Sequence, residues 1–345
     1  MGLIVTCSHR DVPGLTRRLL LAVLATLAPA VAASPAGATG HSTTMVSTAR
    51  ANVGIVDIYT TLGYENGVAA GTGMIISRSG DVLTNNHVIR GATKFRVFDV
   101  MTRRWYLATV AGYSVPRDVA VLHLAHASHL QTIRLGTFAP VRIGQPVVAR
   151  GNAQGLGGTP KAARGKVIAL HHQIVAKDET GDAETLNNVI VTNAPVQPGD
   201  SGGPLQNAQG RAIGMVTAGS TSGPHRGFAI PIRQALKLAR QIAAGNSTAT
   251  VHVGPTAFLG VQLQDAPGGA GAEIAQVIAG KPADAAGLVA GDVITSLDGT
   301  TISSSADVRR VVLSLTPGTA VSIGWTDTGG TPQTGTITPA SGPPQ

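Results

Sequence analysis

Residues 193–205 read NAPVQPGDSGGPL, and this run sets the expectations for the whole chain. Ser201 lies at its centre, after an acid and between glycines. A serine hydroxyl is a poor nucleophile unless a base removes its proton and hydrogen-bond donors receive the oxyanion. Glycines let backbone N–H groups approach a substrate carbonyl closely. Alone, the run fits a glycine-rich turn between two strands equally well, so the rest of the chain must supply partners for Ser201.

Composition indicates a folded, strand-rich protein. Of 345 residues, 43% are hydrophobic and only 13% are charged, and the 44 glycines and 20 prolines favour turns over long helices. The formal net charge is +8, but the basic residues are scattered along the sequence. They form no cluster interleaved with aromatic residues, which is the pattern typical of a nucleic-acid-binding surface. Nucleic acid is therefore not an expected partner.

The N-terminal region has the layout of a secretory signal. Residues 17–33, RRLLLAVLATLAPAVAA, join paired arginines to an apolar run and small residues. The run is shorter than the roughly 20 apolar residues that span a bilayer. We expect residues 1–33 to be a cleaved signal peptide and 34–49 a linker, with the protein secreted or in the cell envelope. An uncleaved membrane anchor is the alternative. Cys7, the only cysteine, would leave with the signal.

The remaining chain divides into two units. Residues 50–244 hold many short apolar runs between Gly/Pro turns, which predicts a β-barrel or sandwich. That unit ends with a helix over 231–243, where apolar residues recur with helical spacing. Residues 245–255 read as a linker, 256–340 as a small α+β unit and 341–345 as a tail.

His87 and Asp118 are the candidate partners of Ser201. His87 follows a predicted strand end, where a packing role is the alternative, and Asp118 begins an apolar run, where a solvated acid is the alternative. Together they give the order His–Asp–Ser, that of chymotrypsin-like barrels. The competing nucleophile elbow requires a helix after the serine, but a glycine pair and a proline follow Ser201.

Three sequence blocks resemble the signature motifs of HtrA/Deg-type, trypsin-like serine proteases: TNNHV (84–88), RDVAVL (117–122) and GDSGGPL (199–205). Residues 256–340 resemble a bacterial PDZ domain through FLGV (258–261), PADAAGL (282–288) and AGDVITSLDG (290–299). Secreted actinobacterial protease–PDZ proteins look most similar. The resemblance implies a mainly β fold, with a chymotrypsin-like double six-stranded β-barrel followed by a small α+β PDZ domain.

The resemblance also implies the catalytic roles. Ser201 would attack the scissile carbonyl, His87 would accept and return its proton, and Asp118 would orient His87. The N–H groups of Gly199 and Ser201 would form the oxyanion hole, with no cofactor and no metal. Asp200 departs from the HtrA pattern, which has asparagine there. In digestive trypsins an aspartate at this position pairs with a new N-terminus, so Asp200 needs another partner or the loop switches between states.

Substrate contacts follow less directly. Trypsin relatives that cut after basic residues carry an acid six residues before the nucleophile, whereas this chain has Pro195. Small or aliphatic P1 residues are therefore expected. Residues Thr217, Ala218 and Gly219 are expected to pair with the substrate backbone as an added strand.

The PDZ-like unit is expected to bind the C-termini of peptides. Phe258, Leu259, Gly260 and Val261 would face the terminal carboxylate, and the peptide would lie against a helix containing Val308 and Val311. Docking only on its own protease unit is the alternative.

The sequence thus predicts an extracytoplasmic endopeptidase that cleaves extended or misfolded polypeptides. A chaperone or peptide-binding scaffold with little or conditional proteolysis is the alternative. A homo-oligomer is possible, because relatives of the HtrA type commonly form trimers through aromatic contacts near the N-terminus. Residues 34–58 of this chain, however, contain no Phe, Trp or Tyr. A trimer is therefore not asserted.

Overall fold

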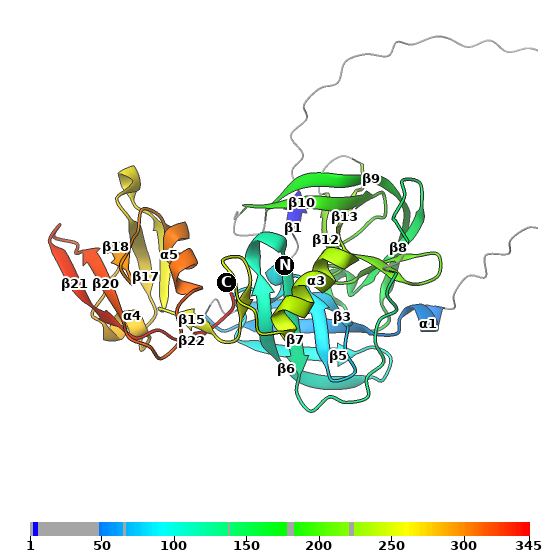
Figure 1. The fold of residues 1–345 in the computed structure, drawn as a ribbon, viewed down its shortest axis with the longest axis horizontal. Helices are drawn as coiled ribbons and strands as arrows, with labels where there is room; N and C mark the ends of the chain where they lie inside the picture. Colours follow the sequence, from blue (N-terminus) through cyan, green and yellow to red (C-terminus); the bar gives the residue numbers. More distant parts are fainter. Residues whose placement is uncertain (1–2, 6–47, 65–66, 137–138, 178–182, 221–223) are drawn as a thin grey trace, which may run out of the picture.

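The computed structural model describes residues 3–5, 48–64, 67–136, 139–177, 183–220 and 224–345. The predicted signal segment 17–33, Cys7 and most of the predicted linker 34–49 lie outside this part. The described chain forms two units, a large one made of two sheets and a smaller one that ends the chain (Figure 1). In the large unit, a short helix, α1 (Thr48–Ala51), precedes the first sheet.

Six consecutive strands form the first sheet of the large unit, with neighbours in the order β6-β5-β2-β3-β4-β7. Pairing of β6 with β7 closes this sheet into a barrel. The strands are β2 (Ile55–Leu62), β3 (Gly67–Ile75), β4 (Asp81–Thr84), β5 (Lys94–Asp99), β6 (Arg104–Ser114) and β7 (Val119–Leu124).

The second sheet has the same plan, in the order β12-β11-β8-β9-β10-β13 and closed by pairing of β12 with β13. Its strands are β8 (Pro146–Gly151), β9 (Lys161–Lys177), β10 (Ala183–Thr192), β11 (Pro204–Asn207), β12 (Ala212–Ser220) and β13 (Gly227–Pro231). A short strand, β1 (Leu3–Val5), joins the edges of β9 and β12. The predicted double six-stranded barrel is confirmed.

Helix α3 (Ile232–Ala243) closes the large unit, as its periodicity predicts. The buried residues of α3 are the five apolar ones at helical spacing, Ile232, Ala235, Leu236, Ala239 and Ile242. They share one apolar cluster with Ile55 and Met74 of the first barrel and Met215 of the second. Because burial of apolar surface is the main favourable term in folding, this shared cluster holds the two barrels together.

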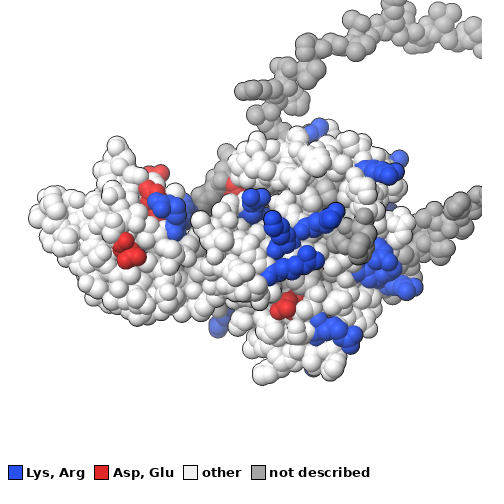
Figure 2. Space-filling view, in the orientation of Figure 1, with Lys and Arg blue, Asp and Glu red and all other residues white. Residues whose placement is uncertain are grey.

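The opposite face of α3 is basic. Arg233, Lys237 and Arg240 are all exposed along it. Figure 2 shows Lys and Arg gathered over the part of the surface where Figure 1 places α3. No helix in the described ranges has the length and apolar character needed to cross a membrane.

The smaller unit is a sheet in the order β16-β17-β18-β20-β21, with β19 beside β18 and two helices packed on it. Its elements are β15 (Thr256–Phe258), β16 (Val261–Asp265), β17 (Ala272–Val277), α4 (Pro282–Ala285), β18 (Val293–Leu297), β19 (Thr300–Thr301), α5 (Ser305–Val312), β20 (Val321–Thr326), β21 (Pro332–Ile337) and β22 (Ala340–Gly342). The Ser304 hydroxyl caps α5 by accepting the Asp307 N–H.

The segments expected to be a linker and a tail both take part in structure. Within 245–255, strand β14 (His252–Val253) pairs with β6 of the first barrel. Strand β22 pairs with β15, and Gln345 beyond it donates its N–H to the Tyr113 hydroxyl at 3.2 Å. The two units are therefore fastened together rather than joined by a free connection.

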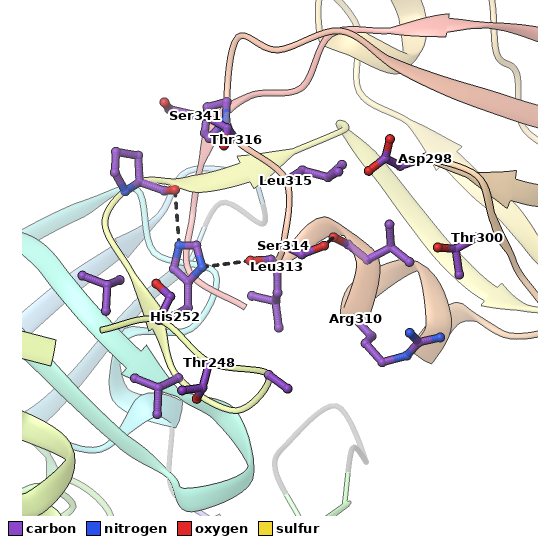
Figure 3. A pocket seen from close by; sticks show the side chains of 17 residues that line it. Thr248, His252, Asp298, Thr300, Arg310, Leu313, Ser314, Leu315, Thr316 and Ser341 are labelled. Atoms are coloured by element: carbon purple, nitrogen blue, oxygen red, sulfur yellow. Dashed lines mark hydrogen bonds between the residues drawn. The ribbon is translucent and has the colours of Figure 1, made fainter. Parts of the chain in front are cut away.

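Further contacts cross between the units. The rings of Tyr64 and Phe258 stack with centroids 5.0 Å apart. A cavity of about 780 Å³ lies between the connection and the end of α5. Figure 3 shows the His252 ring hydrogen-bonded to two backbone carbonyls beside this cavity. Its Nδ1 lies 3.1 Å from the Leu313 oxygen, and its Nε2 lies 3.2 Å from the Pro255 oxygen.

Candidate active site

His87 lies in a one-turn helix, α2 (Asn86–Ile89), directly after the end of β4. The two apolar residues that follow it, Val88 and Ile89, are buried in the core of the first barrel. This anchoring fixes the backbone of α2. His87 itself is only 4% exposed, so its ring is held inside the site.

Asp118 follows a 3₁₀ turn (Val115–Arg117) and adopts a left-handed backbone conformation with φ of +49°. Asn85 supports this conformation by donating from Nδ2 to the Asp118 carbonyl at 2.8 Å. Asp118 is fully buried, and its carboxylate accepts the His87 backbone N–H at 3.0 Å. The acid is thus placed by its own turn and by the helix that carries His87.

The His87 ring faces the same carboxylate. Nδ1 lies 3.0 Å from each Asp118 oxygen. When Nδ1–H donates to this carboxylate, the neutral imidazole carries its lone pair on Nε2. His87 Nε2 is buried and has no hydrogen-bond partner among the described residues. The ring is therefore oriented with a free acceptor nitrogen, as a general base requires.

Ser201 lies on a turn within the loop 193–203 between β10 and β11 and is 5% exposed. Its hydroxyl donates to the Thr217 carbonyl at 3.2 Å. The structure thus brings Ser201 to β12, beside the strand residue that also contacts Asp118. The expected hydrogen bond from the Ser201 hydroxyl to His87 is not formed in this state, in which Thr217 is the acceptor.

Two backbone N–H groups of the same turn point to an oxyanion hole. We call residues 198–202 the oxyanion turn. Within the described part of the chain, neither the Gly199 nor the Ser201 N–H donates a hydrogen bond. Gly199 has φ of +91°, and a Cβ there would lie 2.2 Å from the Asn152 carbonyl oxygen. Only glycine fits this position.

Asp200 contacts its own turn. One carboxylate oxygen, Oδ2, accepts the Gln197 N–H at 2.9 Å, and the other, Oδ1, is buried with no hydrogen-bond partner among the described residues. Burial raises the pKa of Asp200 to about 6, against a smaller lowering by the Gln197 N–H. Asp200 therefore has a backbone donor as its partner.

Thr217 has a different place from the one expected. The sequence assigns Thr217 to backbone pairing with substrate, but the residue is fully buried and its hydroxyl donates to Asp118 Oδ2. Its carbonyl accepts the Ser201 hydroxyl. Both polar groups of Thr217 thus bind candidate catalytic residues, Asp118 through the hydroxyl and Ser201 through the carbonyl. No local sequence signal marks Thr217 for this role.

The expected substrate-pairing edge continues along β12. Ala218 is buried at 4% exposure, and Gly219 is partly exposed. In this structure the backbone of β1 pairs in parallel with residues 218–220. The edge therefore accepts an extended segment.

The space around Pro195, where a substrate side chain is expected, is partly filled by neighbouring residues. Pro195 is exposed and lines a cavity of about 330 Å³ that Asp200 and Gln154 also line. The residue after it, Val196, fills the space toward β13, since a Cβ on Gly227 would lie 2.1 Å from Val196 Cγ2. Sequence reasoning missed Val196, whose contact with a strand far along the chain has no local signature.

The second unit has a groove of about 210 Å³ between β16 and α5. Strand β16 is at the edge of its sheet, so its outer side can take an added strand. The groove is lined by the expected Phe258, Leu259, Gly260, Val261 and Val308, and also by Leu263, Ser305, Arg309, Val312 and Gln345.

Val311, expected at this groove, is not among the residues that line it. Val311 lines the cavity between the two units instead, and Val312 lines the groove. A helix turns by about 100° per residue, so neighbours on α5 face different directions. Gly260, at the other wall, has φ of +83°, and this conformation turns the chain at the groove entrance.

Comparison with known proteins identifies a domain in each of the two units. Residues 71–215 match the trypsin-like peptidase domain family, and residues 257–330 match the PDZ domain family. The chain therefore has a trypsin-like peptidase domain followed by a single PDZ domain, and the proteins it resembles include serine proteases of the HtrA type. The order of the two domains agrees with the two units of the fold.

Relatives of the HtrA type cover most of this chain. Serine protease PepD of Mycobacterium tuberculosis is 32% identical over 302 residues, which are 82% of this chain and 63% of PepD. The periplasmic pH-dependent serine endoprotease DegQ of Escherichia coli is 35% identical over 74% of this chain and 56% of DegQ. The chain thus spans less than two thirds of the length of these curated relatives.

A solved HtrA-type structure is also similar. The protease AlgW, determined with a tripeptide, aligns with a TM-score of 0.50 and 29% identity, over 86% of this chain and 97% of that one. Because 86% of this chain is more than the two barrels contain, the similarity includes the PDZ unit.

Proposed function

We propose that this protein is a serine endopeptidase that cleaves polypeptides through an acyl-enzyme. The observation that carries the proposal is the alignment of the His87 ring on the buried Asp118 carboxylate, with Nδ1 3.0 Å from each oxygen. Ser201 lies across the barrel interface on a turn with two unbonded N–H groups. These are the parts that nucleophilic acyl transfer needs.

The proposed reaction begins with rotation of the Ser201 hydroxyl from the Thr217 carbonyl to His87 Nε2. His87 takes the proton as Ser201 attacks the scissile carbonyl, and Asp118 stabilises the imidazolium. The N–H groups of Gly199 and Ser201 receive the oxyanion. His87 then returns the proton to the leaving amine, and water releases the acyl group by the same steps.

We propose an extracytoplasmic site of action. Among the relatives, PepD is named a serine protease and DegQ a periplasmic serine endoprotease. In addition, residues 17–33 have the pattern of a secretory signal. Substrates would be extended or misfolded chains, since the edge at 218–220 binds backbone as an added strand.

For the residue before the scissile bond we propose a small aliphatic side chain. Val196 fills the space next to Gly227. Pro195 stands at the sequence position where relatives that cut after basic residues carry an acid. Peptide p-nitroanilides that differ only at P1 test this choice. Alanine or valine should be cleaved faster than phenylalanine or lysine, and preferred cleavage after lysine would contradict it.

The PDZ groove is proposed to bind the C-terminus of a peptide. The loop of Leu259 and Gly260 would direct N–H groups at the carboxylate, and the peptide would add to β16. Titration of a peptide with a free C-terminus against the same peptide amidated tests this role. Equal affinity for the two would argue for a groove without carboxylate recognition.

Degradation of unfolded β-casein tests the main proposal. The protein should degrade casein, the Ser201→Ala variant should not, and Ser79→Ala, on an exposed turn, should behave as the wild type. Equal turnover by wild type and Ser201→Ala would contradict the mechanism. Casein binding without turnover by either protein would favour a peptide-binding scaffold.

A further inference from the structure

We propose that Thr72 is a positioning residue that holds the oxyanion turn in its reactive geometry, an inference that rests on the acyl-transfer function proposed above. Thr72 lies in β3 of the first barrel and is fully buried. The oxyanion turn belongs to the second barrel. Every polar group of Thr72 is hydrogen-bonded, and two of them bind the oxyanion turn directly.

The side chain of Thr72 binds Gly199. Its hydroxyl lies 2.7 Å from the Gly199 carbonyl oxygen and 2.9 Å from the Asn152 backbone nitrogen. The Asn152 N–H can only donate, so the hydroxyl oxygen is its acceptor. The single hydroxyl hydrogen is then directed to the Gly199 carbonyl. The hydroxyl thus both accepts and donates, which fixes its direction.

The backbone of Thr72 binds the turn at a second carbonyl, that of Ser201. The Thr72 N–H donates to the Ser201 carbonyl at 2.8 Å. The Thr72 carbonyl in turn accepts the Thr84 hydroxyl at 2.7 Å. Thr84 ends β4, three residues before His87. Thr72 therefore connects the turn of Ser201 to the strand that leads into the catalytic histidine.

The two candidate oxyanion donors are oriented by the carbonyls on the other side of their own peptides, those of Pro198 and Asp200. A trans peptide is planar, with its N–H opposite its C=O. The Gln154 N–H holds the Pro198 carbonyl at 2.6 Å, which turns the Gly199 N–H to the other side. The Gly203 N–H holds the Asp200 carbonyl at 3.0 Å, which does the same for the Ser201 N–H.

Thr72 completes this set from the other barrel. Together with Gln154 and Gly203 it satisfies each carbonyl from Pro198 to Ser201. The hydroxyl is closely packed, since a Cβ on Gly151 would lie 2.8 Å from Thr72 Oγ1. Loss of the hydroxyl would leave the Gly199 carbonyl and the Asn152 N–H both buried without partners, which is a costly state. Rotation of the 199–200 peptide would relieve it, and this rotation takes place at Gly199, whose own N–H is one of the two candidate donors.

Three variants test this role through the kinetics of a chromogenic tetrapeptide with alanine at P1. Thr72→Val keeps the shape but removes the hydroxyl. Removing one oxyanion donor outright lowers kcat by roughly 10²–10³, so a misplaced donor should lower kcat by about ten- to a hundredfold with KM little changed. Thr72→Ser keeps the hydroxyl and should restore most of kcat.

The matched control is Thr60→Val in the neighbouring strand β2. Thr60 is also buried, at 2% exposure, and its hydroxyl donates to a strand carbonyl, that of Ala69. This variant should keep the wild-type kcat. An unchanged kcat in Thr72→Val, or a Thr72→Ser protein as slow as Thr72→Val, would overturn the inference.

A second measurement separates this inference from the proposed function. Amide resonances of residues 197–203 can be followed by NMR in the Ser201→Ala background, where no turnover is needed. Adding Thr72→Val should shift these resonances and speed hydrogen exchange of the Gly203 amide, whereas adding Thr60→Val should not. An unmoved turn would overturn the inference, whatever the activity. A wild-type protein that cleaves no substrate would instead count against the proposed function alone.

Discussion

Thr217 of the second barrel donates a hydrogen bond from its hydroxyl to the buried carboxylate of Asp118 in the first barrel. Asp118 in turn orients His87. The alignment of the acid and base therefore depends on how the two barrels pack, because the Asp118 carboxylate accepts from His87 on one side of the interface and from Thr217 on the other.

Replacing Thr217 by valine should lower kcat for peptide hydrolysis by about tenfold or more. The change keeps the side-chain volume but removes a donor to a buried charged group, an interaction worth roughly 1.5–3 kcal/mol. Thr217→Ser keeps the donor and should stay near wild type. Steady-state kinetics on the alanine-P1 tetrapeptide measures both, and a Thr217→Val protein with normal kcat would contradict the role given to this hydroxyl.

Asp57 should make the protein less stable as the pH rises. It is fully buried opposite Thr72 on the adjacent strand. Burial raises the pKa of Asp57 to about 7, against a smaller lowering by the Gly158 N–H. In the unfolded chain an aspartate has a pKa of about 3.9. Between these values the folded state keeps a proton that the unfolded state has lost, so the free energy of unfolding falls as pH rises.

The Asp57→Asn variant removes this dependence. Its Tm should exceed that of the wild type at pH 8, by roughly 2–4 °C for each kcal/mol recovered, and the difference should shrink toward pH 4. Asp99→Asn is the control, since the buried Asp99 carboxylate accepts bonds from Met101 and Thr102 and its loss should lower Tm. A Tm lowered equally by both changes at pH 8 would contradict the prediction.

Asp200→Asn should keep most of the wild-type kcat at pH 8. An asparagine oxygen can still accept the Gln197 N–H, which is the contact that Asp200 makes. Asp200→Ala leaves that N–H without its acceptor and should lower kcat by several-fold. Activity assays of the two variants decide the matter. If Asp200→Asn were as inactive as Ser201→Ala, the turn would need an ionised carboxylate and a cation to pair with it.

Tyr64→Ala should loosen the contact between the PDZ unit and the first barrel. Its ring stacks on Phe258 at a groove wall, and Lys281 Nζ lies 5.5 Å from the Tyr64 ring centroid. An aromatic pair contributes about 0.5–1.5 kcal/mol beyond area burial, so separated arrangements should become up to about tenfold more populated. Small-angle X-ray scattering should report a larger radius of gyration.

Trp105→Ala is the control for this change. The Trp105 ring packs on Tyr59 and Phe98 within the same barrel. Its removal should leave the radius of gyration unchanged. A Tyr64→Ala protein that scatters like the wild type would mean that β14, β22 and Gln345 hold the units together without the aromatic stack.

Features with local sequence signals could be predicted before the fold was known. His87, Asp118 and Ser201 each stand in a short motif, and their order predicted the barrels that hold them. The spacing of apolar residues predicted α3 almost to its ends. These predictions succeed because a strand, a helix or a tight turn is specified by residues that are neighbours in the chain.

The contacts across the barrels and between the units, in contrast, emerged only from the folded structure. Thr72 and Gly199 are 127 positions apart, and Thr217 and Asp118 are 99 apart. Val311 and Val312 are adjacent yet line different cavities. Such contacts depend on the packing of whole sheets, so no window of sequence carries them. The nucleophile was visible in the sequence, whereas the residues that hold it in place became visible only in the fold.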